Sequence, residues 1–253
     1  MRLCTIEKTG NSSNGSSSGG MANCLGRIAG NFIINAKMTF AMDVDLSKYS
    51  FIGVIEEGDA ASHPYNITEY AITSTNEVTY RRRSHYHSED TNADPRDTTN
   101  PLFSILIPVT DRTDIVDISV RNIDSNTPAF SGTITGYGFN SVETLGNITG
   151  TFAYNNKITL ATEVDLSKYS FIGAIEEGNA KSSASNIIEY AIGTTQAHYR
   201  SHFRSEDTQD TTNPLFSILI PVADRTDIAD ISVRSINNNT PAFSGTITLY
   251  GFN

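Results

Sequence analysis

The feature that most constrains this chain of 253 residues is that it contains nearly the same sequence twice. The segment VDLSKYSFIG at residues 44–53 recurs unchanged at residues 164–173. Residues 97–140 recur as residues 210–253 with substitutions at six of 44 positions. Repeats that stack into solenoids are roughly 20–50 residues long, whereas each copy here spans about 110 residues. The repeat therefore predicts two tandem domains, each long enough to form its own core.

The repeat also sets the expected domain boundaries. We predict an N-terminal arm at residues 1–24, a first domain at 25–140, a linker at 141–144 and a second domain at 145–253. A linker of four residues leaves little freedom, so the domains should pack closely or share a partner. The copies diverge most between residues 59–96 and 179–209, which align only with gaps that total seven residues. We expect surface loops there, because loops tolerate insertions.

Alternation of apolar and polar residues predicts strands within each copy. Met38, Phe40, Met42 and Val44 alternate with smaller or polar residues, a period typical of a half-buried strand. Dense runs of β-branched and aromatic residues follow at 51–55, 102–107, 115–120 and 130–139, and Gly, Pro, Asn and Asp separate them. This rhythm predicts seven or eight strands per copy. The expected fold class is all-β, with two tandem antiparallel β-sandwich (jelly-roll-like) domains.

The order of these segments resembles β-sandwich modules of tailed-bacteriophage fibre and virion surface proteins. The resemblance covers each copy almost from end to end, and rests on DLSKYSFI at 45–52, FSILIPV at 103–109 and TITGYGF at 133–139. It implies a structural virion protein made in the host cytoplasm, of the capsid-decoration, head-fibre or tail-fibre type. It also implies a trimer, and it brings no catalytic residues. Three copies of a duplicated domain would present six similar domains, which matches a six-fold or quasi-six-fold position.

Composition excludes several other classes. The net charge of −10 argues against nucleic acid as the partner, since phosphate binding needs clustered Lys and Arg. No apolar run approaches the ~20 residues that span a bilayer, so we expect no membrane insertion. The first ten residues also lack the apolar core of a secretory signal. Two alternative functions stay open: a carbohydrate-binding adhesin or receptor-binding module, and a non-viral surface or filament protein.

The N-terminal residues suggest an anchoring arm. Residues 10–20 read GNSSNGSSSGG, the composition of a flexible coil. We expect residues 1–24 to dock onto other virion proteins, for example by adding a strand to a sheet. Cys4 and Cys24 flank this tract and could pair, although two thiols are the default in a reducing cytosol.

The divergent part of each copy carries the most unusual side chains. Aromatic residues that stack on sugars stand beside Arg residues and acids that hydrogen-bond hydroxyl groups, so a host-surface glycan is one candidate ligand. The alternative, which we favour, is an interface in which these Arg residues pair with acids of a neighbouring subunit. The ligand or interface candidates are Tyr80, Arg81, Arg82, His85, Tyr86, Tyr199, Arg200, His202 and Phe203.

Other patterns do not amount to a catalytic or metal site. His85 and His87 have the spacing of a metal pair, but the second copy lacks it. The series Asp90-Thr-Asn92-Ala-Asp94 resembles the start of a calcium loop without its later Gly and Glu. Glu56 and Glu57 are adjacent in a predicted strand and face opposite ways, so they cannot flank one glycosidic bond. We expect no cofactor, no metal and no enzymatic activity.

Overall fold

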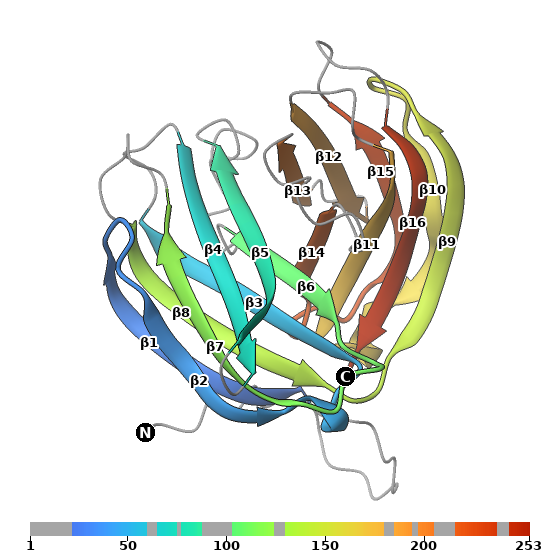
Figure 1. Ribbon diagram of the computed structural model, residues 1–253. Helices are drawn as coiled ribbons and strands as arrows, with labels where there is room; N and C mark the ends of the chain where they lie inside the picture. The colour runs from blue at the N-terminus through green and yellow to red at the C-terminus, as the bar shows by residue number, and fades with distance from the viewer. Residues whose placement is uncertain are drawn as a thin grey trace, which may run out of the picture.

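In the computed structural model the described part of the chain is almost entirely β-structure (Figure 1). The residues that the structure describes are 22–59, 65–74, 77–87, 103–123, 130–179, 185–193, 197–204, 216–236 and 243–253. Eight strands lie in each copy of the repeat, in agreement with the prediction.

The first domain is a sandwich of two four-stranded antiparallel sheets. Its strands are β1 (Asn23–Phe32), β2 (Met38–Asp45), β3 (Phe51–Asp59), β4 (Tyr65–Ser74), β5 (Glu77–His87), β6 (Phe103–Pro108), β7 (Ile115–Asn122) and β8 (Phe130–Phe139). One sheet has the order β1-β8-β3-β6, and the other has the order β2-β7-β4-β5.

The second domain repeats this arrangement. Its strands are β9 (Glu143–Phe152), β10 (Ile158–Asp165), β11 (Phe171–Asn179), β12 (Ser185–Ile192), β13 (Ala197–Arg204), β14 (Phe216–Pro221), β15 (Ile228–Ser235) and β16 (Phe243–Phe252). The sheets run β9-β16-β11-β14 and β10-β15-β12-β13.

The strands pair in the nested order of a jelly roll. In the first domain the first strand pairs with the eighth, the second with the seventh, the third with the sixth and the fourth with the fifth. A long hairpin folded over on itself gives this pattern. Strand β1 begins at Asn23, inside the predicted arm, and β9 begins at Glu143, inside the predicted linker. The connection between the domains is therefore shorter than the sequence suggested.

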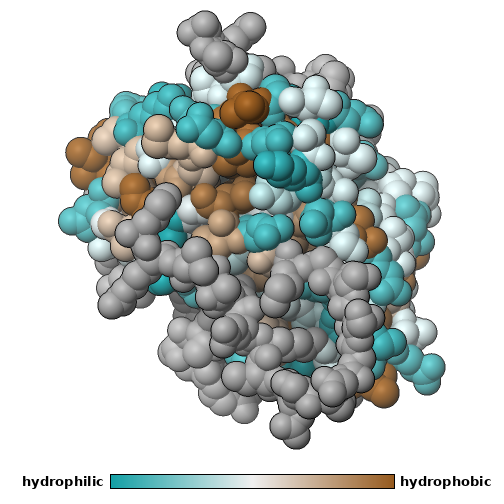
Figure 2. Space-filling view, turned by 90° about the horizontal axis from the view of Figure 1, so that it is seen from below, coloured by the Kyte–Doolittle hydropathy of each residue, from teal (hydrophilic) through white to brown (hydrophobic). Residues whose placement is uncertain are grey.

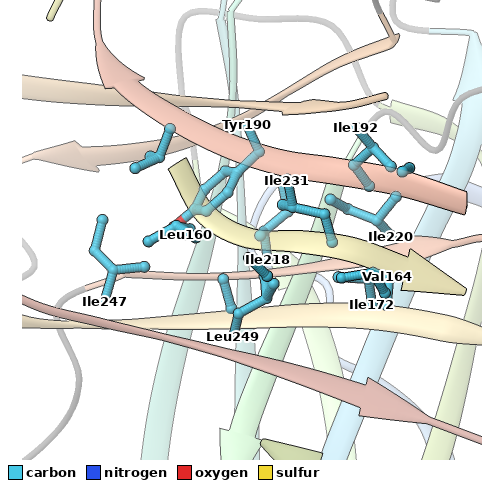
Figure 3. Close-up of a cluster of buried hydrophobic side chains, with 14 of the residues drawn as sticks. Leu160, Val164, Ile172, Tyr190, Ile192, Ile218, Ile220, Ile231, Ile247 and Leu249 are labelled. Carbon is cyan, nitrogen blue, oxygen red and sulfur yellow. The ribbon is translucent and has the colours of Figure 1, made fainter. Parts of the chain in front are cut away.

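Each sandwich encloses its own apolar core. In the second domain, the side chains of Leu160, Ile231 and Ile218 surround the ring of Tyr190 (Figure 3). The first domain has an equivalent cluster around Tyr70, whose ring lies edge-on to Phe40 with centroids 6.2 Å apart. Phe, Tyr and β-branched residues thus fill both cores in a chain that contains no Trp.

A bulge interrupts β2 and β10 at equivalent positions. The register shifts between Ala41 and Val44, and Asp43 there adopts a positive φ of 54°. The Asp43 amide donates a hydrogen bond to the Asp117 carboxylate (3.0 Å), which holds this left-handed turn. Glu163 has the same φ in the second domain, and its amide donates to Asp230 at 2.9 Å.

Candidate functional site: the junction between the two domains

The outer faces of two sheets pack against each other and join the domains. Buried apolar residues from both domains form one cluster there: Phe51, Ile55, Leu106, Tyr137, Phe139, Phe171, Ile175, Leu219 and Phe252. Strands β3, β6, β8, β11, β14 and β16 supply them. We call this cluster the seam. These strands are apolar on both faces, since one face lies in the sandwich and the other in the seam.

The aromatic contacts of the seam occur in reciprocal pairs. Phe139 lies 5.5 Å from Phe171, and its counterpart Phe252 lies 5.6 Å from Phe51, between ring centroids. The rings of Phe139 and Phe252 meet each other at 4.5 Å. Each fully buried ring stabilises the packed state by roughly 1.5–3 kcal/mol. The seam is therefore an apolar core between the domains.

Two hydrogen bonds repeat the same reciprocity at the edge strands β6 and β14. The Leu106 amide donates to the Ser217 hydroxyl at 3.0 Å, and the Leu219 amide donates to the Ser104 hydroxyl at 2.9 Å. Each serine thus satisfies a backbone donor that the edge of the other sheet would leave unpaired. The two edges are covered without a backbone ladder between them.

Two glycines allow the sheets to approach. A Cβ on Gly53 would lie 2.5 Å from Cδ2 of Leu219, and one on Gly173 would lie 2.8 Å from Cδ2 of Leu106. Both distances are too short for a carbon contact, so each leucine occupies the space over the opposite glycine. A larger residue at either position would have to displace that leucine and the neighbouring ring of Phe139 or Phe252.

The candidate residues of the two repeats lie on strands that approach each other beside the seam. Strand β5 carries Tyr80 to Tyr86 and is the edge of its sheet, and β13 carries Tyr199 to Phe203 and is the edge of the other. β5 lies close to β13, and these strands also adjoin β6 and β14 (Figure 1). The structure therefore brings both halves of the predicted site to one region.

The strand registers relate the candidates of one repeat to those of the other. His85 pairs with Ile67, and His202 pairs with the equivalent Ile187, so the two histidines occupy the same position in the two repeats. Arg200 pairs with Glu189, and in the first domain the residue opposite Glu69 is Arg83. In the same registers Arg82 corresponds to Tyr199 and Tyr86 to Phe203. Arg83 was absent from the candidates, although the register makes it the counterpart of Arg200.

Tyr199 is the candidate whose side chain the structure describes. It is partly buried and packs against the core of the second domain. Its ring thus takes part in packing the sandwich. The side chains of Tyr80, Arg81, Arg82, His85, Tyr86, Arg200, His202 and Phe203 lie outside the described residues, so glycan binding stays a prediction.

An ion pair with a buried carboxylate joins β4 to the adjacent strand β7, next to these residues. The Arg121 guanidinium donates two hydrogen bonds to one carboxylate oxygen of Glu69, at 2.9 Å and 2.6 Å. Arg234 and Glu189 form the same pair in the second domain, at 2.7 Å. Each glutamate is 3% exposed although it points away from the sandwich core. The alternation of the strand did not reveal these pairs, because an outward glutamate ordinarily remains solvated.

A second buried carboxyl connects the two sheets of each sandwich. Glu56 on β3 accepts hydrogen bonds from the hydroxyls of Tyr70 and Thr68 on β4, and Glu176 accepts one from Tyr190. Burial raises the pKa of Glu56 to about 8, so this carboxyl is largely protonated at neutral pH. Glu56 is fully buried inside the sandwich. Its neighbour Glu57 is exposed, as the predicted alternation requires.

The structure describes little of the predicted N-terminal arm and of the calcium-like series. Residues 1–21, with Cys4, lie outside the described residues, as do Asp90, Asn92 and Asp94. Within the described ranges, no group of three or more His, Cys, Asp or Glu residues could hold a metal ion. The same part of the chain contains no helix that is both long and apolar enough to cross a membrane.

Comparison with known proteins gives no family. No protein-family model and no curated protein matches this chain. Among solved structures the chain is similar to the STIV MCP, with 9% identity, a TM-score of 0.23, and coverage of 91% of this chain and 95% of that chain. It is also similar to PNGase F, a glycosylasparaginase from Flavobacterium meningosepticum, with 9% identity, a TM-score of 0.24, and coverage of 90% and 94%.

A third similar structure is the VP2 subviral particle of infectious bursal disease virus. The identity is 11%, the TM-score is 0.23, and the coverage is 98% of this chain and 76% of that chain. All three TM-scores are far below 0.5, so none of these similarities bears on what this chain does.

Proposed function

We propose that this chain is a structural protein of a virion, in which its two fused jelly rolls serve as one building block. The junction between the domains carries the proposal. The two sandwiches are joined at the seam by packed apolar rings and two reciprocal hydrogen bonds. Gly53 and Gly173 let the sheets come close there. A rigid pair of domains suits repetitive assembly, since each block then presents its contact surfaces at a fixed angle. The proposal assigns no enzymatic activity.

Exposed apolar side chains support assembly with further copies. Ile115 and Ile228 begin β7 and β15 at equivalent positions and are 58% and 69% exposed. Met42 on β2 is also 69% exposed. On the face drawn in Figure 2, hydrophobic residues form groups bordered by hydrophilic ones. Because both repeats expose an isoleucine at this position, we take Ile115 and Ile228 as the candidate contact residues.

The finer proposal is a protein of a tailed bacteriophage that forms a trimer. Six similar domains in a trimer fit a six-fold or quasi-six-fold position. Residues 1–24 would dock onto another virion protein, and capsid decoration, head fibre and tail fibre are the candidate locations. The sequence resemblance of the strand segments to phage fibre modules supports this reading.

Mass measurement of the purified chain in solution tests the proposal. Light scattering coupled to size-exclusion chromatography should give three times the chain mass of 27.5 kDa, and negative-stain images should show six lobes. A chain that stays monomeric at high concentration contradicts the building-block proposal. The double variant Ile115→Ser/Ile228→Ser should weaken the trimer, whereas Thr149→Ser, on an exposed strand position, should not.

Deletion of residues 1–24 tests the arm separately. The sandwiches should still fold and form the same oligomer, because only the first residues of β1 are lost. Incorporation into particles should fall to background. Unchanged incorporation would refute docking by the arm and leave the oligomer result standing.

A further inference from the structure

The seam has the symmetry of an interface between identical subunits. Each contact described above occurs twice with the roles of the domains exchanged, as in an isologous two-fold interface. Tyr137 lies 5.0 Å from Phe171, and Tyr250 lies 5.1 Å from Phe51, between ring centroids. Two surfaces related in this way are complementary to themselves.

The amino acids at the seam are also the same in both repeats. The matched positions are Phe51 and Phe171, Gly53 and Gly173, Ile55 and Ile175, Ser104 and Ser217, Leu106 and Leu219, Tyr137 and Tyr250, and Phe139 and Phe252. Elsewhere on the same strands the copies differ, for example at Val54 and Ala174 in the two cores. The buried residues of the seam therefore do not distinguish a partner of the other repeat from a partner of the same repeat, and the difference lies at the margin, where Ala22 corresponds to Val142.

We infer that the seam is a self-association surface whose partner is a second copy of the same repeat. A first domain can pair with a first domain, and a second domain with a second domain, through the contacts that now join the two. In the intact chain the short connection favours the pair within one molecule by raising the effective concentration. This inference does not depend on the proposed virion role.

A nicked full chain tests the inference. A protease recognition sequence inserted between Ser141 and Val142 allows the folded protein to be cut between β8 and β9. An isotope-labelled batch and an unlabelled batch are cut, mixed and incubated, and native mass spectrometry then reports the pairs. Mixed labels within first–second pairs establish that the halves have separated and reassociated. First–first and second–second pairs should then be present at a level comparable with first–second pairs.

A seam variant gives the decisive control. Leu106→Arg places a charge over Gly173 and should abolish first–first and first–second pairs while second–second pairs remain. Thr149→Arg, exposed on the second domain outside the seam, should leave all three kinds of pair unchanged. The inference is overturned if exchange yields first–second pairs alone, if the halves remain monomers, or if first–first pairs survive Leu106→Arg.

Discussion

The Tyr70 hydroxyl donates a hydrogen bond to the Glu56 carboxyl and so joins the two sheets of the first sandwich through its interior. Both residues are fully buried. Tyr190 and Glu176 repeat the arrangement, so the duplicated domain has kept a polar link inside an otherwise apolar core. A buried carboxyl that is neutral can accept from the tyrosine without placing a charge in a medium of low dielectric.

This link makes stability depend on pH. The pKa of Glu56 is raised from its ordinary 4.5 to about 8, so the folded state binds a proton that the unfolded state releases. The contribution is fully present below about pH 4.5 and is lost as pH rises toward 8, on the order of 4 kcal/mol. Denaturant unfolding at pH 5, 7 and 8.5 should show this decline. Glu56→Gln should reduce this decline, and Glu57→Gln, on the exposed neighbour, should leave it unchanged.

The serine hydroxyls of the seam should contribute measurably to stability. In Ser104→Ala/Ser217→Ala, the amides of Leu219 and Leu106 lose their acceptors in a partly buried site. We expect a loss of roughly 2–4 kcal/mol in the free energy of unfolding, since an unsatisfied buried donor costs about 1–3 kcal/mol. Urea titration measures it. Ser244→Ala serves as the matched control, because the Ser244 hydroxyl is exposed and hydrogen-bonds the Thr151 hydroxyl. It should change the free energy of unfolding by less than about 0.5 kcal/mol.

Two glycines of one strand should respond in opposite ways to alanine. On β9, a Cβ at Gly146 would lie 2.2 Å from the carbonyl oxygen of Leu160, whereas a Cβ at Gly150 would meet nothing within 4 Å. Gly146→Ala must displace backbone, so we expect a loss of about 2 kcal/mol or more. Gly150→Ala should be neutral or stabilising by up to ~1 kcal/mol, because alanine restricts the unfolded chain. Equal thermal unfolding midpoints for the two variants would contradict the close approach of β9 to β10.

The ion pair between Arg121 and Glu69, whose carboxylate is buried, should stabilise the fold more than the pair between Arg112 and Asp114. Arg121→Ala leaves the Glu69 carboxylate, 3% exposed, without its strongest described donor, and we expect a loss of about 1–3 kcal/mol. Arg112→Ala breaks a pair with Asp114 in which both side chains are about a third exposed, so less than about 1 kcal/mol is expected. Denaturant titration of both variants at low and high salt separates them, since salt screens the exposed pair more strongly.

Periodicity predicted most of the fold, because the strands that alternate or form dense apolar runs are those that the structure contains. Strand β4 did not stand out, since it buries Thr68 and Glu69 beside Tyr70 and so breaks the apolar pattern. The strands that contain Ile105 and Ile134 are buried on both faces. What covers the outer side could not be inferred, because periodicity within one segment carries no information about which distant surface it meets.

The sequence pointed to one part of the region where the domains meet and missed the other. Sequence divergence directed attention to β5 and β13, and the structure does place these strands near each other. The seam residues escaped notice for the opposite reason: they are the same in both repeats and look like ordinary core. Glu69 and Glu189 escaped as well, since a strand glutamate gives no sign in the sequence that an arginine on the adjacent strand will enclose it.

The chain enters and leaves each domain at one place. Asn23 on the first strand pairs with Gly138 near the end of the eighth, and Glu143 pairs with Gly251 in the same way. A gene segment that encodes such a unit can be copied in tandem without a long connector, because the end of one unit already lies where the next must start. A duplication of this unit therefore needs only a short junction between its two copies.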